Sequence, residues 1–273
     1  MRRSFKLGFV PFWVCACATQ SPVMETVRVD WLVPAMGTVV RVSAVVPVTS
    51  QSPLRELAER VIHSCDLTFS DWSEESELRR LERNGLTNWQ TPTPLFLDLL
   101  RISREAHEQT NGFFDPAVGA VIWKVSSLPS ARFSDLEWGP KGSFRFARDP
   151  VRLTFGGIAK GYCLGLLADR FEDNKVDVYR IDGGGGNRVE RGPNQRLALH
   201  VSGSRATDRG GAPHLIDPKN AARVIQGARM VSCRRVSRDE SEAAVGARAD
   251  VWSKALVLNP HLQLPLGCEL HRP

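Results

Sequence analysis

The chain has 273 residues, of which 42% are hydrophobic and 24% are charged, as is usual for a soluble globular protein. Three of its +6 net charges come from Arg2, Arg3 and Lys6, and no later basic cluster alternates with aromatic residues, which argues against a nucleic-acid partner. No apolar run reaches the roughly 18 residues that a membrane-spanning helix requires.

The start of the chain is organised like a secretory signal peptide. Its basic first residues precede an apolar stretch at residues 7–14, and this order predicts an exported bacterial protein. The run Val14-Cys15-Ala16-Cys17 resembles a lipobox, in which a lipidated Cys17 would anchor the protein to the inner membrane. An ordinary cleaved signal and a misassigned start codon are the alternatives. We expect a signal peptide at residues 1–17 and a periplasmic location.

The first folded elements are expected to be a hairpin and a helix. Residues 27–32 and 39–46 are rich in valine and partly alternating, with a turn at residues 34–37 between them. Ser52 and Pro53 are typical of a helix start, and apolar residues follow them at helical spacing.

Further elements follow along the chain. A second helix is predicted from Thr93-Pro94 to Asn111-Gly112, a short strand at 151–155, and a helix at 159–171. Strands are predicted at 176–181 and 197–201, a loop at 203–220, and a last helix at 243–258. Paired strands with helices between them indicate an α+β fold with mixed, mainly antiparallel sheets and packed helices.

The four cysteines after the leader match no metal-binding spacing. Cys65 and Cys163 fall on apolar faces of predicted helices, where a buried free thiol is the common outcome. Cys233 and Cys268 complete the set, and the sequence predicts no disulfide.

The helix start at residues 154–161, where glycines allow a tight turn, is a candidate phosphate site. The amides at the start of a helix attract anions, and Lys160 adds a positive charge within reach. The segment has neither the spacing of a Walker loop nor that of a dinucleotide-binding loop. The alternative is a helix start of no special function with a solvated lysine.

Three other segments are weaker candidates. Asp182 precedes four glycines at residues 183–186, which would let a ring or a diphosphate approach the backbone, or would simply form a hairpin turn. Asp250 and Lys254 share a helix face, so that Asp250 could hold Mg²⁺ or could pair with Lys254. His214 lies near Asp217 and could transfer a proton, although a lone histidine in a loop usually does not.

The order of these segments along the chain resembles the ApbE family of flavin transferases. The resemblance covers about residues 36–258 and rests on these motifs: Met36-Gly37-Thr38, SDWSEESEL at 70–78, TNGFFDPAVG at 110–119, FGGIAKGY at 155–162, Gly185-Gly186-Asn187, Ser202-Gly203 followed by HLIDP at 214–218, and Ala249-Asp250 with Ala255-Leu256.

The resemblance implies a fold and an activity. Residues 25–273 would form a flavin transferase domain of T-fold-like architecture that binds FAD with Mg²⁺. Such proteins transfer FMN from FAD to a threonine or serine hydroxyl of an acceptor protein, and AMP leaves. The acceptors are typically flavoprotein subunits of membrane redox pumps of the sodium-translocating quinone reductase and Rnf types. Some members instead hydrolyse FAD, acting as pyrophosphatases.

The resemblance also assigns roles by position. Ala159, through its carbonyl, and Asp250, through its carboxylate, would hold Mg²⁺, and His214 would be the catalytic residue that transfers a proton. FAD would be bound by a wider set, in which Trp72 contacts the isoalloxazine ring: Met36, Gly37, Trp72, Asp115, Lys160, Gly161, Gly185 and Gly186.

Two positions depart from the family pattern. Lys254 stands where the family usually has a threonine that binds the metal, and Gly165 stands where it usually has an aspartate. An ammonium about 4 Å from a divalent ion would cost roughly 8 kcal/mol at an effective dielectric constant of about 20. A degenerate homologue that binds FAD without turnover is therefore the alternative to an active transferase.

Overall fold

The computed structural model describes residues 25–125, 131–205 and 215–271. Within these ranges, seven strands form one antiparallel sheet in the order β1-β2-β5-β6-β7-β10-β11. Their bounds are β1 Thr26–Ala35, β2 Thr38–Pro47, β5 Tyr179–Asp182, β6 Arg188–Arg191, β7 Leu199–Arg205, β10 Ala228–Cys233 and β11 Cys268–His271.

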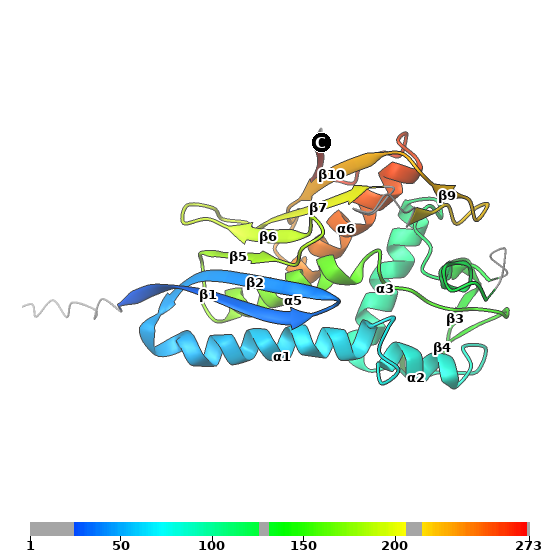
Figure 1. The fold of residues 1–273 in the computed structure, drawn as a ribbon, viewed down its shortest axis with the longest axis horizontal. Helices are drawn as coiled ribbons and strands as arrows, with labels where there is room; N and C mark the ends of the chain where they lie inside the picture. The colour runs from blue at the N-terminus through cyan, green and yellow to red at the C-terminus, as the bar shows by residue number, and fades with distance from the viewer. Residues whose placement is uncertain (1–24, 126–130, 206–214, 272–273) are drawn as a thin grey trace, which may run out of the picture.

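Three long helices cover one face of this sheet. They are α1 (Gln51–Phe69), α5 (Ala159–Asp173) and α6 (Glu242–Leu258). In Figure 1, α1 runs alongside the β1–β2 hairpin and α6 lies alongside β7 and β10, as their contacts also show. Alternate residues of β2, from Val40 to Val46, are buried beneath these helices, which is the pattern of a sheet with one covered face.

The remaining elements form a smaller region at one end of the molecule. There α2, β3 and β4 lie together, opposite the start of β1 (Figure 1). An aromatic cluster that includes Phe96, Phe144 and Phe155 joins this region to α1. The bounds are α2 Glu77–Arg83, α3 Pro94–Gln109, α4 Gly119–Ile122, β3 Leu136–Trp138, β4 Phe144–Phe146, β8 Leu215–Ile216 and β9 Arg223–Val224, with short 3-10 helices at Val48–Ser50, Phe133–Asp135 and Pro140–Gly142.

The predicted α+β class, the first hairpin and the four long helices are confirmed. The predicted strand at 151–155 is wrong, because only Arg152 makes a β-bridge there, with Val118. The first helix starts at Gln51 rather than after Ser52. The loop expected at 203–220 is interrupted, since β7 continues to Arg205 and β8 follows. The signal peptide predicted at residues 1–17 lies outside the described residues.

Cys233 and Cys268 form a disulfide that the sequence analysis did not predict. The two residues face each other across β10 and β11, 35 positions apart in the chain. Such a pairing depends on which strands are neighbours, and cysteine spacing does not reveal this. Cys65 and Cys163 are buried free thiols, as predicted.

The helices in the described ranges include none that is long and apolar enough to cross a membrane.

Helices α5 and α6 cross in direct backbone contact. A Cβ atom on Gly161 would lie 2.0 Å from the carbonyl oxygen of Gly246, and one on Gly246 would lie 2.1 Å from that of Gly161. Next along α5, a Cβ on Gly165 would lie 2.1 Å from the Glu242 carbonyl oxygen. Each distance is far below van der Waals contact. The crossing therefore leaves no room for a side chain at position 165, where the family usually has an aspartate.

The start of α6 is held by buried charges. Asp169 accepts hydrogen bonds from the amides of Glu242 and Ala243 at 2.8 and 3.0 Å. The Glu242 carboxylate bonds His200 Nε2 at 2.6 Å and pairs with Arg235. Burial opposes ionisation of Glu242, but the hydrogen bond from His200 and the guanidinium of Arg235 outweigh burial and lower its pKa.

We expect Gly165→Asp to separate α5 from α6. The added side chain would clash with the backbone of Glu242 and bury a carboxylate, which should lower the free energy of unfolding by about 3 kcal/mol or more and the melting temperature by roughly 10 °C. Thermal unfolding followed by circular dichroism measures this. Gly192→Asp is the control, because a Cβ there meets only the Gln195 side chain, at 3.5 Å or beyond. Equal stability of the two variants would show that the crossing tolerates a side chain.

We expect Glu242→Gln to destabilise the protein by about 3 kcal/mol near pH 7, because Arg235 and His200 lose a buried charged partner. Since the folded-state pKa of Glu242 is lowered, its pairing stabilises the folded protein above the ordinary value of 4.5. That contribution is lost as the pH falls below this value and through the folded-state pKa.

The difference in unfolding free energy between Glu242→Gln and wild type should therefore shrink from about pH 7 to about pH 3.5 in urea titrations. Glu56→Gln is the control, since this exposed carboxylate makes only long contacts with Arg60, at 3.6 Å, and Ser52, at 3.5 Å, and should contribute less than about 0.5 kcal/mol. A difference that stays constant over this pH range would show that folding does not lower the pKa of Glu242.

Candidate functional site

A cavity of about 230 Å³ opens between the end of α1 and the start of α5, and we call it the α1–α5 pocket. Among the predicted site residues, Met36, Trp72, Ala159 and Lys160 line it. The full lining is Met36, Cys65, Asp66, Phe69, Ser70, Asp71, Trp72, Phe155, Gly156, Ala159 and Lys160. Segments that are far apart in the chain thus meet at one place.

The hairpin turn between β1 and β2 forms one edge of the pocket. Met36 and Gly37 both have positive φ, 53° and 67°, as two-residue hairpin turns of type I′ require. This conformation is unfavourable for methionine. The Met36 amide donates to Asp66 Oδ1 at 3.1 Å, which ties the turn to α1 and holds Met36 at the pocket.

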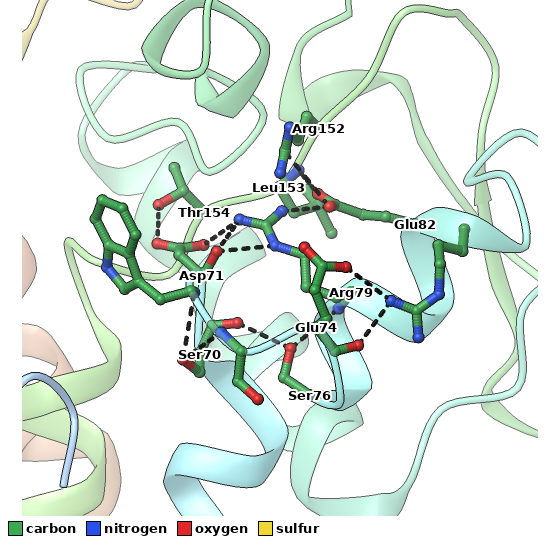
Figure 2. Close-up of polar contacts among 12 residues, drawn as sticks. Ser70, Asp71, Glu74, Ser76, Arg79, Glu82, Arg152, Leu153 and Thr154 are labelled. Carbon is green, nitrogen blue, oxygen red and sulfur yellow. Dashed lines mark hydrogen bonds and ion pairs between the residues drawn. The ribbon is translucent and has the colours of Figure 1, made fainter.

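A buried arginine holds the opposite wall. Arg79 donates to the backbone carbonyl of Asp71, with its Nε at 2.9 Å, and pairs with Glu82 (Figure 2). Thr154 donates to Asp71 Oδ2 at 2.8 Å, and the Leu153 amide donates to Glu82 at 2.9 Å. The network therefore joins the loop after α1 to the segment that leads into α5.

Burial governs the two carboxylates of this network. It raises the pKa of Asp71, and the hydrogen bond from Thr154 and the charge of Arg79 only partly oppose the rise. It also raises the pKa of Glu82, against the hydrogen bond and charge of Arg79. Since Arg79 is itself buried, its charge needs these partners.

Trp72 is the exposed aromatic residue of the pocket lining. Its side chain is 80% exposed, and its ring meets that of Trp123 edge-on, with centroids 4.7 Å apart. Trp123 is in turn fixed by the guanidinium groups of Arg79 and Arg152, at 5.4 and 5.2 Å from its ring centroid. Trp123 thus holds one edge of Trp72 in place, while much of the Trp72 ring faces solvent.

The two glycine-rich segments lie close to each other. The glycines at residues 183–186 form the turn between β5 and β6, and Gly184, Gly185 and Gly186 all have positive φ. A Cβ on Gly185 would lie 3.4 Å from Lys160 Nζ. The ammonium of Lys160 therefore bridges the start of α5 and the glycine turn.

Asp250 satisfies the start of α5 from the neighbouring helix. No side chain of its own segment caps α5, but Asp250 Oδ2 accepts a hydrogen bond from the Gly161 amide at 3.0 Å. Asp250 Oδ1 accepts from Ser202 Oγ at 3.2 Å and pairs with Lys254. The i,i+4 ion pair considered in the sequence analysis is therefore present.

This arrangement does not fit a divalent ion at Asp250. Both carboxylate oxygens already accept hydrogen bonds, and the Lys254 ammonium is paired with Oδ1. In the described parts of the chain, no group of three or more histidine, cysteine, aspartate or glutamate residues could hold a metal. Ala159, the other expected ligand, lies at the first position of α5.

The ApbE family model matches residues 36–264. The chain belongs to the ApbE family. An FAD:protein FMN transferase of Chlamydia trachomatis serovar D is 29% identical to it in an alignment of 185 positions that covers 60% of this chain and 56% of that protein. The match thus spans little more than half the length of this curated relative.

Solved structures share the fold. Flavin transferase ApbE from Vibrio cholerae superposes with a TM-score of 0.67 at 17% identity, covering 90% of this chain and 97% of that one. A flavinyl transferase ApbE from Pseudomonas stutzeri, in its apo form, gives 0.67 at 18% identity, covering 87% and 86%. The fold expected from the resemblance is therefore confirmed.

Among the predicted site residues that the structure describes, six do not line the α1–α5 pocket: Gly37, Asp115, Gly161, Gly185, Gly186 and Asp250. Asp115 is buried and accepts hydrogen bonds from the amides of Ala117 and Phe133, at 2.8 and 3.2 Å. Burial raises its pKa, against the opposing charge of His107. Its contact with FAD stays a prediction, and so does the role of His214, which lies outside the described residues.

The residues that hold the pocket walls were not among the predicted site residues. Asp66, Asp71, Arg79 and Thr154 were given no role, although Asp71 stands inside the quoted SDWSEESEL motif. Their sequence signal is weak, because each acts through a partner that is 30 to 83 positions away, or through a backbone carbonyl.

Proposed function

We propose that this protein binds FAD and transfers its FMN half to a threonine or serine hydroxyl of an acceptor protein, with release of AMP. The observation that carries the proposal is the convergence of an exposed tryptophan, the start of α5 and a glycine turn at one place. Membership of the ApbE family supports the same reaction.

The chain offers complementary groups for the isoalloxazine ring and for the diphosphate of FAD. Trp72 presents an exposed aromatic ring to an isoalloxazine. The start of α5 and the Lys160 ammonium present positive charge to the diphosphate. The backbone at Gly185, without a Cβ atom, leaves room for phosphate oxygens beside Lys160.

The reaction would proceed by attack of the acceptor hydroxyl oxygen on the phosphorus of the FMN half. The new phosphoester bond forms as the bond to AMP breaks, the hydroxyl loses its proton, and AMP leaves with the bridging oxygen. Negative charge grows on the phosphoryl and leaving oxygens, so fixed amides and Lys160 would lower the barrier. His214 is the candidate for taking the proton.

The resemblance also implies Mg²⁺ held by Ala159 and Asp250. When bound, such an ion would polarise the diphosphate. The pairing of Asp250 with Lys254 argues against this site in the present arrangement.

The expected location and partners remain part of the proposal. Export to the periplasm is supported by the Cys233–Cys268 disulfide, because such bonds persist in oxidising compartments. Anchoring to the inner membrane by a lipidated Cys17, and acceptors among the flavoprotein subunits of membrane redox pumps, follow from the leader and from the family resemblance.

A second candidate is FAD binding without turnover, and Lys254 at the expected metal position favours it. Hydrolysis of FAD to FMN and AMP is a third outcome of the same chemistry, with water in place of the acceptor hydroxyl.

Incubation of the purified protein with FAD, with Mg²⁺ or EDTA, and with a redox-pump acceptor domain tests the proposal. We expect AMP release and an acceptor band that shows flavin fluorescence in a denaturing gel. AMP without a labelled acceptor would identify a pyrophosphatase. Bound FAD without AMP would identify a binding protein, and either result would overturn the transferase proposal.

We expect Trp72→Ala to weaken FAD binding about tenfold, because a stacked aromatic contact of about 1.4 kcal/mol is lost. Titration of flavin fluorescence measures the affinity. Thermal stability should change little, since the side chain is 80% exposed. Trp89→Ala is the matched control, because Trp89 is 49% exposed, packs against Arg145 and does not line the pocket. Equal FAD affinity in the two variants would contradict the assignment of Trp72.

A further inference from the structure

Lys254 is paired with the buried carboxylate at the start of α5. It lies one helical turn after Asp250 on α6, and its Nζ forms an ion pair with Asp250 Oδ1. The same Nζ donates to the backbone carbonyl of Asp250 at 3.2 Å. The Lys254 side chain is only 18% exposed, and that of Asp250 is fully buried.

The neighbouring groups already satisfy the hydrogen bonding and the charge of the Asp250 carboxylate. Gly161 donates to one carboxylate oxygen, and Ser202 and Lys254 donate to the other. A carboxylate buried away from water must have its charge balanced nearby. Lys254 supplies that balance from the same helix, so the site is complete within the chain.

Lys254 also lies against the turn that leads into α5. A Cβ on Gly157 would lie 3.5 Å from Lys254 Cδ, and Gly157 follows Gly156, which lines the α1–α5 pocket. The Lys254 side chain therefore packs against the segment that would face a bound diphosphate. A metal ion held by Asp250 and the Ala159 carbonyl would have to share this place with it.

We infer that the Lys254 ammonium is a built-in cation that takes the place of a divalent metal ion at Asp250. The protein then keeps a positive charge beside the start of α5 at all times, and divalent ions are neither required nor bound at this carboxylate. The part of this inference that concerns FAD rests on the proposed function. The part that concerns metal binding does not.

The first test measures metal binding without FAD. Thermal unfolding in EDTA and in millimolar Mg²⁺, and titration with Mn²⁺ followed by electron paramagnetic resonance, are compared for wild type, Lys254→Thr and Lys254→Arg. We expect wild type and Lys254→Arg to show no Mg²⁺ stabilisation and no Mn²⁺ bound at one equivalent. Lys254→Thr should melt lower in EDTA and regain several degrees in Mg²⁺, because ligand binding to the folded state stabilises it.

Lys219→Thr is the control for loss of an ammonium elsewhere, since Lys219 stacks on Phe113 and does not contact Asp250. It should respond to Mg²⁺ as wild type does. Stoichiometric Mn²⁺ binding by wild type would overturn the inference even if Lys254→Thr fails to fold. So would a folded Lys254→Thr that gains no affinity for Mn²⁺.

The second test measures FAD affinity by fluorescence titration in EDTA and in Mg²⁺. Wild type should bind equally well in both, within about twofold, whereas Lys254→Thr should bind about tenfold more weakly in EDTA and recover in Mg²⁺. A loss of wild-type affinity in EDTA would overturn the inference. If wild type binds no FAD in either buffer, the proposed function fails, while the metal-binding result still decides the identity of the cation at Asp250.

Discussion

The backbone contact between α5 and α6 is the constraint on which the candidate site depends. Glycines at 161, 165 and 246 let the two helices touch without side chains between them. Because they touch, the carboxylate of Asp250 on α6 reaches the Gly161 amide on α5 and replaces a cap that the preceding residues do not supply. A wider crossing would leave this amide without an acceptor and would move Lys254 away from the turn before α5.

Ion pairs with buried members then hold the walls of the pocket in place. Arg79 is buried with Asp71 and Glu82, and this costly arrangement is stable only while every partner is in place. The pocket walls are therefore fixed before any ligand arrives, which favours binding of a rigid ring. Asp250 and Lys254 follow the same rule at the other side, where a tethered ammonium cannot dissociate as a metal ion can.

Much of the fold follows from local patterns. The helical spacing of apolar residues in α1 and α3, the Thr93-Pro94 start and the valine alternation of β2 all act within a few residues, so they could be read without knowledge of the fold. The weak strands could not. Only Val189 of β6 is buried, and β11 is a largely exposed edge strand, so neither has a periodic apolar pattern. They are strands because neighbouring strands offer hydrogen bonds.

For the site, the order of the motifs along the chain was sufficient to indicate the family and to name Trp72, Lys160 and Asp250 as residues of interest. Tertiary structure alone decided what surrounds each of them. Lys254 is four residues from Asp250, a spacing that permits either an ion pair or a metal ligand on one helix face. The choice depends on the donors that β7 and α5 bring to the same carboxylate. Sequence spacing describes one helix, whereas the balance of a buried charge is set by every element around it.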